Sequence, residues 1–132
     1  MILGIGIDSV STARIEKLLL QFKEKFTGKI FVENEISKAE SLKTPEIQTL
    51  YYAKRFAAKE AFSKAIGLGI GRGIDFKDIE IANDAFGKPH IKILNNKEEF
   101  LKEHFNCTNF AIHLSLTDEF PIASAFVTIE KI

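Results

Sequence analysis

The chain has 132 residues, which suits one domain and leaves little room for two, so we expect a single domain over residues 1–132. Lysine plus arginine and aspartate plus glutamate balance at 18 each, so bulk charge favours neither a nucleic acid nor a membrane surface as partner. The lone Cys107 excludes an internal disulfide and fits a reducing compartment, and no segment resembles a signal peptide or a membrane span, so we expect a cytoplasmic protein.

The first predicted element is a strand, because residues 2–8 alternate with a period of two. One of its faces carries three apolar side chains, those of Leu3, Ile5 and Ile7. The other face has almost no side-chain bulk and is made of Gly4, Gly6 and Asp8. Glycine in a strand often marks a place where another backbone approaches closely, so we expect this face to lie against a second element.

A helix is predicted next, over residues 12–26, with Ser9 or Ser11 as its N-cap. Its apolar stripe is made of Ile15, Leu18, Leu19, Phe22 and Phe26. Four polar side chains line up beside that stripe: Arg14, Lys17, Gln21 and Lys25. They form either an ordinary solvated flank or a docking edge for an acidic partner. Residues 27–29 are predicted as a turn, and residues 32–42 as a short, charged helix.

The longest predicted helix begins at Pro45, with Thr44 as its N-cap, and ends at Gly67. Four alanines recur along it with a spacing of four and form a ridge without bulk: Ala53, Ala57, Ala61 and Ala65. Glu60 and Lys64 lie beside this ridge, one turn apart. Packing the glycine face of the first strand on the alanine ridge would bring Asp8 near Glu60.

Glycines then alternate from Gly67 to Gly73, but they follow a helix, whereas the glycines of a dinucleotide fingerprint link a strand to a helix. Gly67 is explained as a helix C-cap, and the remaining glycines can present backbone N–H groups to a phosphate. A hairpin is predicted from two strands, residues 78–82 and 90–94, followed by a short helix over residues 96–105.

The last two predicted elements are strands over residues 110–117 and 122–129, joined by a turn at residues 118–121. The first of them alternates cleanly, with Leu114 on its inward face and His113 on the opposite one. Strands thus come early and late around the helices, with hairpins instead of regular strand–helix–strand alternation. This order favours an α+β fold with an antiparallel sheet packed against the long central helix.

The residue types at the strand–helix contact suggest a chemistry. Asp8 and Glu60 have no His or Cys cluster beside them and suit a cation that prefers oxygen, and Mg²⁺ is typically held by one or two carboxylates together with substrate phosphates. Lys64, Lys59 and Arg55 can supply positive charge to a phosphate. The residues alone therefore predict a metal-assisted site for phosphate chemistry, with a solvated helix face as the alternative for these charges.

Three stretches in this order resemble the holo-[acyl-carrier-protein] synthases, the short single-domain type of the 4′-phosphopantetheinyl transferase superfamily. They are Gly6-Ile7-Asp8, then Phe56-Ala57-Ala58-Lys59-Glu60-Ala61-Phe62-Ser63-Lys64, then His113-Leu114-Ser115-Leu116. The likeness in order, spacing and length covers essentially the whole chain. Many members carry a Ser-His pair after the last stretch, where this chain has Thr117-Asp118-Glu119, so no second histidine is assigned a role there.

The resemblance implies transfer of the 4′-phosphopantetheine arm from coenzyme A to a serine of apo-acyl carrier protein. It implies Asp8 and Glu60 as Mg²⁺ ligands and Lys64 as the residue that stabilises the leaving phosphate. The coenzyme A contacts that it implies are Arg55, Lys64, Gly67, Gly69 and His113. The base that takes the serine proton is left open between a water or hydroxide on the metal and a carboxylate.

The resemblance also implies that an acidic carrier protein docks on the edge formed by Arg14, Lys17, Gln21 and Lys25, and that the protein is a homotrimer with sites at the subunit boundaries. Two other interpretations stay open. In one, the protein is a non-catalytic module that binds coenzyme A or another nucleotide. In the other, the same transfer serves carrier domains of secondary metabolism.

Overall fold

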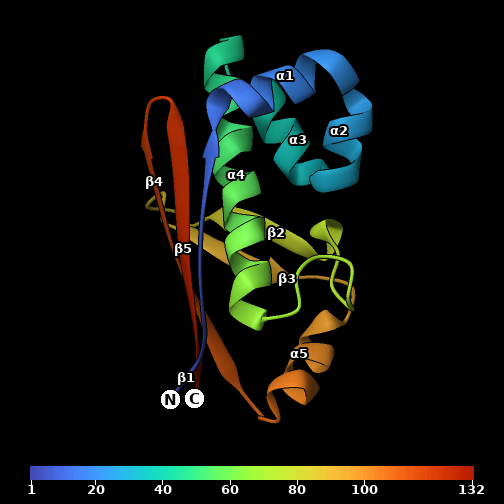
Figure 1. The fold of residues 1–132 in the computed structure, drawn as a ribbon, viewed down its shortest axis with the longest axis vertical. Helices are drawn as coiled ribbons and strands as arrows, with labels where there is room; N and C mark the ends of the chain where they lie inside the picture. The colour runs from blue at the N-terminus through green and yellow to red at the C-terminus, as the bar shows by residue number, and fades with distance from the viewer.

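The computed structural model describes residues 1–132 as an α+β fold with five strands and five α-helices. Figure 1 shows a sheet on one side, the long helix α4 against it, and the other helices beyond. The strands are β1 (Ile2–Ser11), β2 (Ile79–Asn83), β3 (Pro89–Ile93), β4 (Phe110–Glu119) and β5 (Ile122–Lys131). The α-helices are α1 (Thr12–Phe22), α2 (Glu24–Ile30), α3 (Glu33–Glu40), α4 (Pro45–Ile66) and α5 (Lys97–Phe105), and Phe76–Asp78 forms a 3₁₀ turn, η1.

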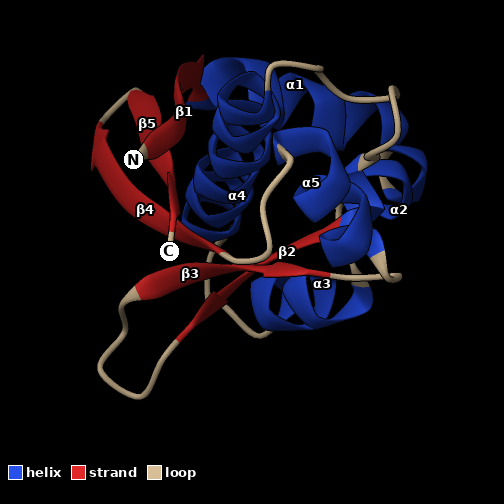
Figure 2. Cartoon of the chain, turned by 90° about the horizontal axis from the view of Figure 1, so that it is seen from below, coloured by secondary structure: helices blue, strands red, loops and turns tan.

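The strands form two antiparallel sheets, as the predicted α+β class requires. The larger sheet has the order β1-β5-β4, so that the first and last strands of the chain are neighbours, and the smaller one is the β2–β3 hairpin. Figure 2 shows this hairpin crossing below α4 and extending away from the helices. Both termini lie together at one end of the larger sheet (Figure 1), where the Lys131 amide donates to the Met1 carbonyl at 2.8 Å.

Helix α4 is the centre of the fold and has the predicted ends. The Thr44 hydroxyl accepts from the Ile47 amide at 3.2 Å, Pro45 occupies the first turn, and Gly67 closes the helix with φ of 81°. One side of α4 packs on β1 and β5, and the other side packs on α1, α3 and β2. Because the helix is covered on nearly all sides, its buried residues are not confined to one stripe.

The prediction of one helix over residues 12–26 was wrong. Lys23 adopts a φ of 48°, which ends α1 at Phe22 and starts a second helix, α2, at Glu24. Residues 27–29, predicted as a turn, lie inside α2. The cap itself is Ser11, whose hydroxyl accepts from the Arg14 amide at 3.1 Å. The apolar stripe continues through the break, because Phe26 and Ile30 of α2 are buried.

The remaining boundaries differ from the predicted ones by small shifts. Strands β2 and β3 are each displaced by one residue, and β4 runs on to Glu119, so the predicted turn shrinks to Phe120-Pro121, whose peptide bond is cis. None of the helices combines the length and the apolar character that a membrane-crossing segment would need.

The face of the larger sheet that points away from α4 is unusually apolar. Ile5 and Ile7 of β1 are 60% and 62% exposed, and Phe126, which pairs with Ile7 across the β1–β5 ladder, is 44% exposed. These side chains form one row on the outer face of the sheet. The sequence pattern had separated the apolar face of β1 from its glycine face, and it is the glycine face that packs inward.

Candidate active site at the contact of β1 and α4

Strand β1 and helix α4 touch backbone to backbone. A Cβ atom built on Gly6 would lie 1.9 Å from the Ala61 carbonyl oxygen, and one built on Gly4 would lie 1.9 Å from that of Ala65. Real Cβ atoms are never this close to a carbonyl, so only glycine fits at these two positions. The predicted packing of the glycine face on the alanine ridge is therefore present in the structure.

This contact gathers three charged side chains at its margin. The Lys64 ammonium donates to the Asp8 carboxylate at 3.1 Å and to the Ile7 carbonyl at 3.0 Å. The Asp8 side chain is 17% exposed and that of Lys64 is 55% exposed, so the lysine is the mobile, solvent-facing partner. Glu60 lies one turn before Lys64 on α4 and is half-buried.

The surroundings of Glu60 disfavour the ionised form of its carboxyl group. Burial raises the pKa of the Glu60 carboxyl above its ordinary value of 4.5, and the negative charge of Asp8 raises it further. Lys64 and Arg14 lower it, without cancelling the first two causes. A cation bound to Glu60 would offset both the cost of burying its charge and the repulsion from Asp8.

We expect Glu60→Gln to stabilise the metal-free protein at pH 7 and to raise its melting temperature by about 2 °C at most, because Glu60 is only half-buried and solvent screens its charge. Because the Glu60 pKa is raised in the folded state, folded protein binds more protons than unfolded protein between 4.5 and that raised value. The advantage of the variant is therefore complete above the folded pKa and disappears as the pH falls to 4.5.

Thermal melts in EDTA between pH 4 and 8 check this expectation. Glu16→Gln, which removes an exposed carboxylate from α1, is the control and should leave the melting temperature nearly unchanged. A lower melting temperature for Glu60→Gln at pH 7 would mean that the Glu60 charge stabilises the fold instead.

The donor set at this site fits Mg²⁺ better than a transition metal. It offers two carboxylates, and no cluster of three or more His, Cys, Asp or Glu side chains exists anywhere in the chain. Mg²⁺ usually keeps several waters and takes one or two protein carboxylates together with phosphate oxygens, so the carboxylates of Asp8 and Glu60 are a suitable set.

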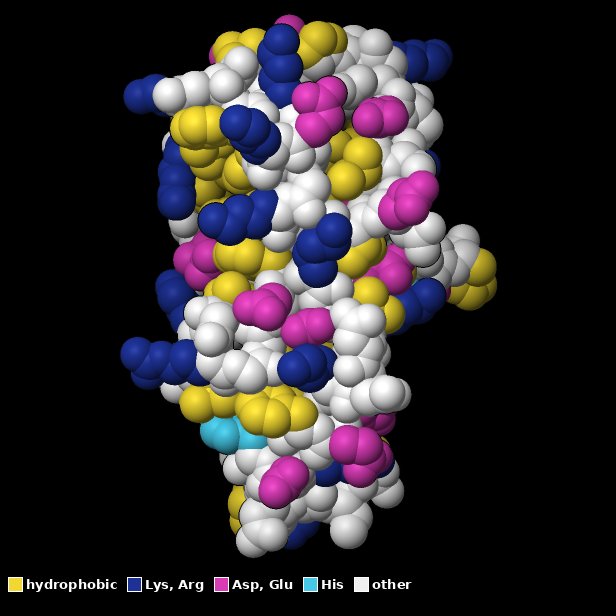
Figure 3. Space-filling model, turned by 90° about the vertical axis from the view of Figure 1, so that its right-hand side faces the viewer, with side chains coloured by type: hydrophobic (Ala, Val, Ile, Leu, Met, Phe, Trp, Pro, Cys, Tyr) yellow, Lys and Arg dark blue, Asp and Glu magenta, His cyan; other side chains and the backbone are white.

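A cleft of about 510 Å³ opens beside Glu60, with an apolar floor and a basic rim. Its apolar floor and walls are formed by Leu18, Phe22, Phe26, Ile30, Phe56 and Phe76. Arg14, Lys25 and Lys29 supply the rim, and the Arg14 guanidinium lies 5.5 Å above the Phe56 ring. Figure 3 shows Lys and Arg side chains bordering a hydrophobic patch on this side of the molecule.

The predicted docking edge is thus only partly assembled at this cleft. Arg14 and Lys25 line it, whereas Lys17 and Gln21 are exposed on α1 outside it. Lys29 was missed, because residues 27–29 were predicted as a turn and not as part of a helix. A continuation of the i, i+4 series from Lys25 to Lys29 was the signal that could have found it.

Arg55 lies in a separate pocket that shares no residue with the Glu60 cleft. Its guanidinium stacks 4.0 Å over the Tyr51 ring and donates to the Asn83 side chain at the end of β2. Arg55 is only 6% exposed, and its Nε has no hydrogen-bond partner. The Arg55 Nε–H group is therefore a buried donor that is left unsatisfied in this chain.

His113 lies on the outer face of the larger sheet, where its Nε2 is 2.8 Å from the Glu130 carboxylate. It pairs across the ladder with Thr128, which pairs in turn with Ile5, so His113 belongs to the face opposite Asp8. A single chain therefore does not bring Arg55 and His113 to the cluster of Asp8, Glu60 and Lys64.

The sequence pattern suggested that Lys59 supplies positive charge to a phosphate, and this prediction was wrong. Lys59 is fully buried and bonded to the Glu35 carboxylate at 2.7 Å. Gly67 and Gly69 use their amides at the end of α4, donating to the Lys64 and Ser63 carbonyls at 3.1 Å and 3.3 Å. No other atom lies within 4 Å of where a Cβ would stand on either glycine, so a ligand could approach both.

The comparisons with known proteins agree on one family. The model of the "4′-phosphopantetheinyl transferase superfamily" matches residues 4–125. A holo-[acyl-carrier-protein] synthase of Bartonella bacilliformis is 44% identical over 133 aligned positions, which span 100% of this chain and 98% of the relative.

Two solved structures show the same fold. The crystal structure of a holo-[acyl-carrier-protein] synthase from Neisseria meningitidis matches with a TM-score of 0.86 and 39% identity, over 99% of this chain and 100% of that one. A synthase from Bacillus anthracis, solved in complex with coenzyme A (3′,5′-ADP), matches with a TM-score of 0.80 and 42% identity, over 100% of this chain and 99% of the other.

Proposed function

The chain belongs to the 4′-phosphopantetheinyl transferase superfamily, and we propose that it is a holo-[acyl-carrier-protein] synthase. It transfers the 4′-phosphopantetheine arm of coenzyme A to a serine of apo-acyl carrier protein and releases adenosine 3′,5′-bisphosphate. The observation that carries this proposal is the cluster of Asp8, Glu60 and Lys64 beside a cleft with a basic rim. A module that only binds nucleotide has no need of two carboxylates held at one point.

Asp8 and Glu60 are the residues that would hold Mg²⁺, which when bound neutralises pyrophosphate charge and polarises its oxygens. In the transfer, the serine oxygen forms a bond to the phosphorus on the pantetheine side, and the bond from that phosphorus to the adenosine-side phosphate breaks. The serine proton is released. Lys64 is exposed enough to turn from Asp8 toward the leaving phosphate, where it stabilises the negative charge that develops.

The nucleotide end of coenzyme A is assigned to Arg55 and His113, with Gly67 and Gly69 beside the pyrophosphate. Arg55 lines a pocket of its own and has a buried N–H group without a partner, and His113 faces away from Asp8 on the outer sheet face. If one site needs all of these groups, they have to come from more than one subunit. A homotrimer with sites at the subunit boundaries meets this requirement.

The exposed apolar row of Ile5, Ile7 and Phe126 supports such an assembly, because a large exposed apolar patch marks an interaction surface. We expect Ile7→Asp to reduce the particle mass from three chains to one chain of 14.8 kDa, since it places a charge in a row of exposed apolar side chains that the trimer would bury. Light scattering after size-exclusion chromatography measures this mass.

Leu20→Asp is the control for that experiment, because Leu20 is 72% exposed on α1 and lies outside the row. It should leave the mass unchanged. A wild-type protein that already elutes at the mass of one chain would show that the trimer is wrong.

The cleft beside Glu60 is assigned to the acidic carrier protein. We expect Arg14→Glu to raise the KM for carrier protein about tenfold, because it replaces an attraction at the rim by a repulsion, while the KM for coenzyme A changes less than about twofold. The effect should shrink as sodium chloride is added, since salt screens exposed charges.

Lys43→Glu carries the same change of charge on an exposed residue outside the cleft, and it should leave both KM values near those of the wild type. Equal increases in both KM values for Arg14→Glu would indicate damage to the fold and not a lost docking contact.

Intact-mass spectrometry of apo-acyl carrier protein incubated with the protein, coenzyme A and Mg²⁺ tests the proposed function. A mass gain of one phosphopantetheine arm, lost in EDTA, supports the synthase. Tight coenzyme A binding without transfer to any carrier would favour a nucleotide-binding module. Transfer only to a carrier domain of secondary metabolism would keep the chemistry and change the partner.

The lone Cys107 is compatible with the reducing cytoplasm, where we place the reaction.

A further inference from the structure

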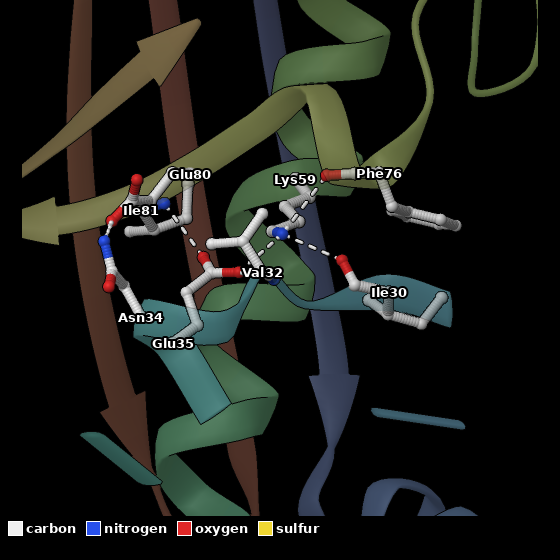
Figure 4. A network of polar contacts seen from close by, with 8 residues as sticks. All are labelled: Ile30, Val32, Asn34, Glu35, Lys59, Phe76, Glu80 and Ile81. Atoms are coloured by element: carbon white, nitrogen blue, oxygen red, sulfur yellow. Dashed lines mark hydrogen bonds and ion pairs between the residues drawn. The ribbon is translucent and has the colours of Figure 1, made fainter. Parts of the chain in front are cut away.

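Lys59 is buried in the middle of the fold and bonded to three other elements. Its ammonium, which has three N–H donors, meets the Glu35 carboxylate at 2.7 Å, the Ile30 carbonyl at 2.8 Å and the Phe76 carbonyl at 3.2 Å. Figure 4 shows these bonds converging on Lys59 from α3, from the end of α2 and from η1. Each donor therefore has a partner.

The carboxylate of Glu35 extends this network by two more bonds. Its Oε1 also accepts from the Val32 amide at 2.9 Å, and its Oε2 accepts from the Ile81 amide of β2 at 2.9 Å. Glu35 is 1% exposed. A charge pair this deeply buried is tolerated only when its remaining hydrogen-bonding groups are satisfied, and here they are.

The two carbonyl groups that Lys59 holds belong to walls of the Glu60 cleft. Ile30 and Phe76 both line that cleft, although they are 46 positions apart in the sequence. Glu60 itself follows Lys59 in α4. Successive side chains of a helix point about 100° apart, so Lys59 reaches the walls from behind while Glu60 faces the cleft.

We propose that Lys59 is a positioning residue for the carrier-facing cleft: its ammonium fixes the walls at Ile30 and Phe76 at a set distance from Glu60. This inference rests on the proposed function, because the cleft is assigned there to the carrier protein. In this network the Glu35 carboxylate holds the Lys59 ammonium in place. Lys59 lies in the stretch from Phe56 to Lys64 that carries the family resemblance, and the proposal gives it a role without contact to coenzyme A.

Two variants separate the proposed positioning of the cleft walls by Lys59 from a contribution of Lys59 to the stability of the fold alone. Lys59→Met keeps a long, unbranched side chain that lacks the terminal ammonium, removes all three donated bonds and leaves Glu35 as an unpaired buried charge. Lys59→Met combined with Glu35→Gln removes that charge as well, so the double variant should recover part of the melting temperature lost by the single one. Both variants lack the hydrogen bonds from residue 59 to the Ile30 and Phe76 carbonyls.

Three measurements are made: kcat and KM for carrier protein, the dissociation constant for coenzyme A by calorimetry, and backbone hydrogen exchange. We expect kcat/KM for carrier to fall on the order of 10-fold to 100-fold in both variants, as for small misplacements far from the chemistry. The dissociation constant for coenzyme A should change less than about twofold in Lys59→Met. The double variant is not used for this readout, because Glu35 lines the same pocket as Arg55. Exchange should accelerate in residues 24–32 and 74–78 and stay unchanged in β4 and β5.

Leu101→Ala is the control for lost stability, because Leu101 is fully buried in α5 and lies outside the cleft. It should lower the melting temperature and leave kcat/KM for carrier unchanged. If Leu101→Ala impairs the carrier reaction as much as Lys59→Met, or if the double variant recovers activity together with melting temperature, Lys59 only stabilises the fold.

Failure of the proposed function itself would be recognised separately. In that case the wild-type protein modifies no carrier, and the hydrogen-exchange experiment, which needs no substrate, still decides the role of Lys59. Unchanged exchange at both wall segments in Lys59→Met would overturn the inference.

Discussion

Gly6→Ala is expected to destabilise the protein by about 4 kcal/mol or more, the range reached only by a few identifiable mechanisms. The new Cβ would lie 1.9 Å from the Ala61 carbonyl oxygen and 2.8 Å from the Ala65 amide nitrogen, and both are backbone atoms of a helix packed on all sides. Neither can move without displacing α4 from the sheet. Because the free energy of unfolding of such domains is about 5–15 kcal/mol, this substitution would remove much of it.

Denaturant unfolding measures this effect, and Gly28→Ala is its matched control. No atom lies within 4 Å of a Cβ built on Gly28, which sits inside α2. The same substitution there should be neutral or stabilise by up to about 1 kcal/mol, because alanine is the better helix former. If Gly6→Ala unfolds at the same denaturant concentration as the wild type, the strand and the helix are not in backbone contact.

Glu60→Ala is expected to lower the rate of arm transfer by about 10³-fold or more, a loss of roughly 4 kcal/mol of transition-state stabilisation. The Glu60 carboxylate is one of the two proposed Mg²⁺ ligands, so chelation by EDTA should have a similar effect on the wild type. Because the Glu60 charge is unfavourable in the metal-free fold, the variant should stay folded.

The intact-mass assay measures the rate, and calorimetric titration with Mg²⁺ in the presence of coenzyme A gives a second readout that needs no turnover. Glu46→Ala removes an exposed carboxylate from the first turn of the same helix and should keep the wild-type rate. Retention of more than a tenth of the activity by Glu60→Ala would remove Glu60 from the metal site.

The features that could be predicted from the sequence are those fixed by neighbouring residues. Thr44-Pro45 and Gly67 specify the ends of α4 locally, and the alternation of β1 separates a glycine face from an apolar face whatever the rest of the chain does. The contact of β1 with α4 followed from this glycine face and from the alanine ridge of α4, because two surfaces with little side-chain bulk allow their backbones to approach closely.

The features that were missed depend on residues far away in the sequence. Lys59 has the i, i+4 spacing from Arg55 that an exposed charged face would show, but its partner Glu35 lies on α3, 24 positions earlier. Lys23 breaks the first helix by adopting a positive φ that is uncommon for a lysine, so no local signal marked the end of α1. Because α2 was not predicted as a separate helix, Lys29 was not predicted as part of the cleft.

The pairing of β1 with β5 has a consequence for covalent tethering. Because the two ends of the chain lie together at one end of the larger sheet, a carrier domain fused to either terminus would start from nearly the same point. Asp8 lies six residues along β1 from Ile2, about 20 Å at the usual rise of a strand. A short flexible linker covers that distance, so fusions in either order would give the tethered carrier a similar effective concentration at the carboxylates.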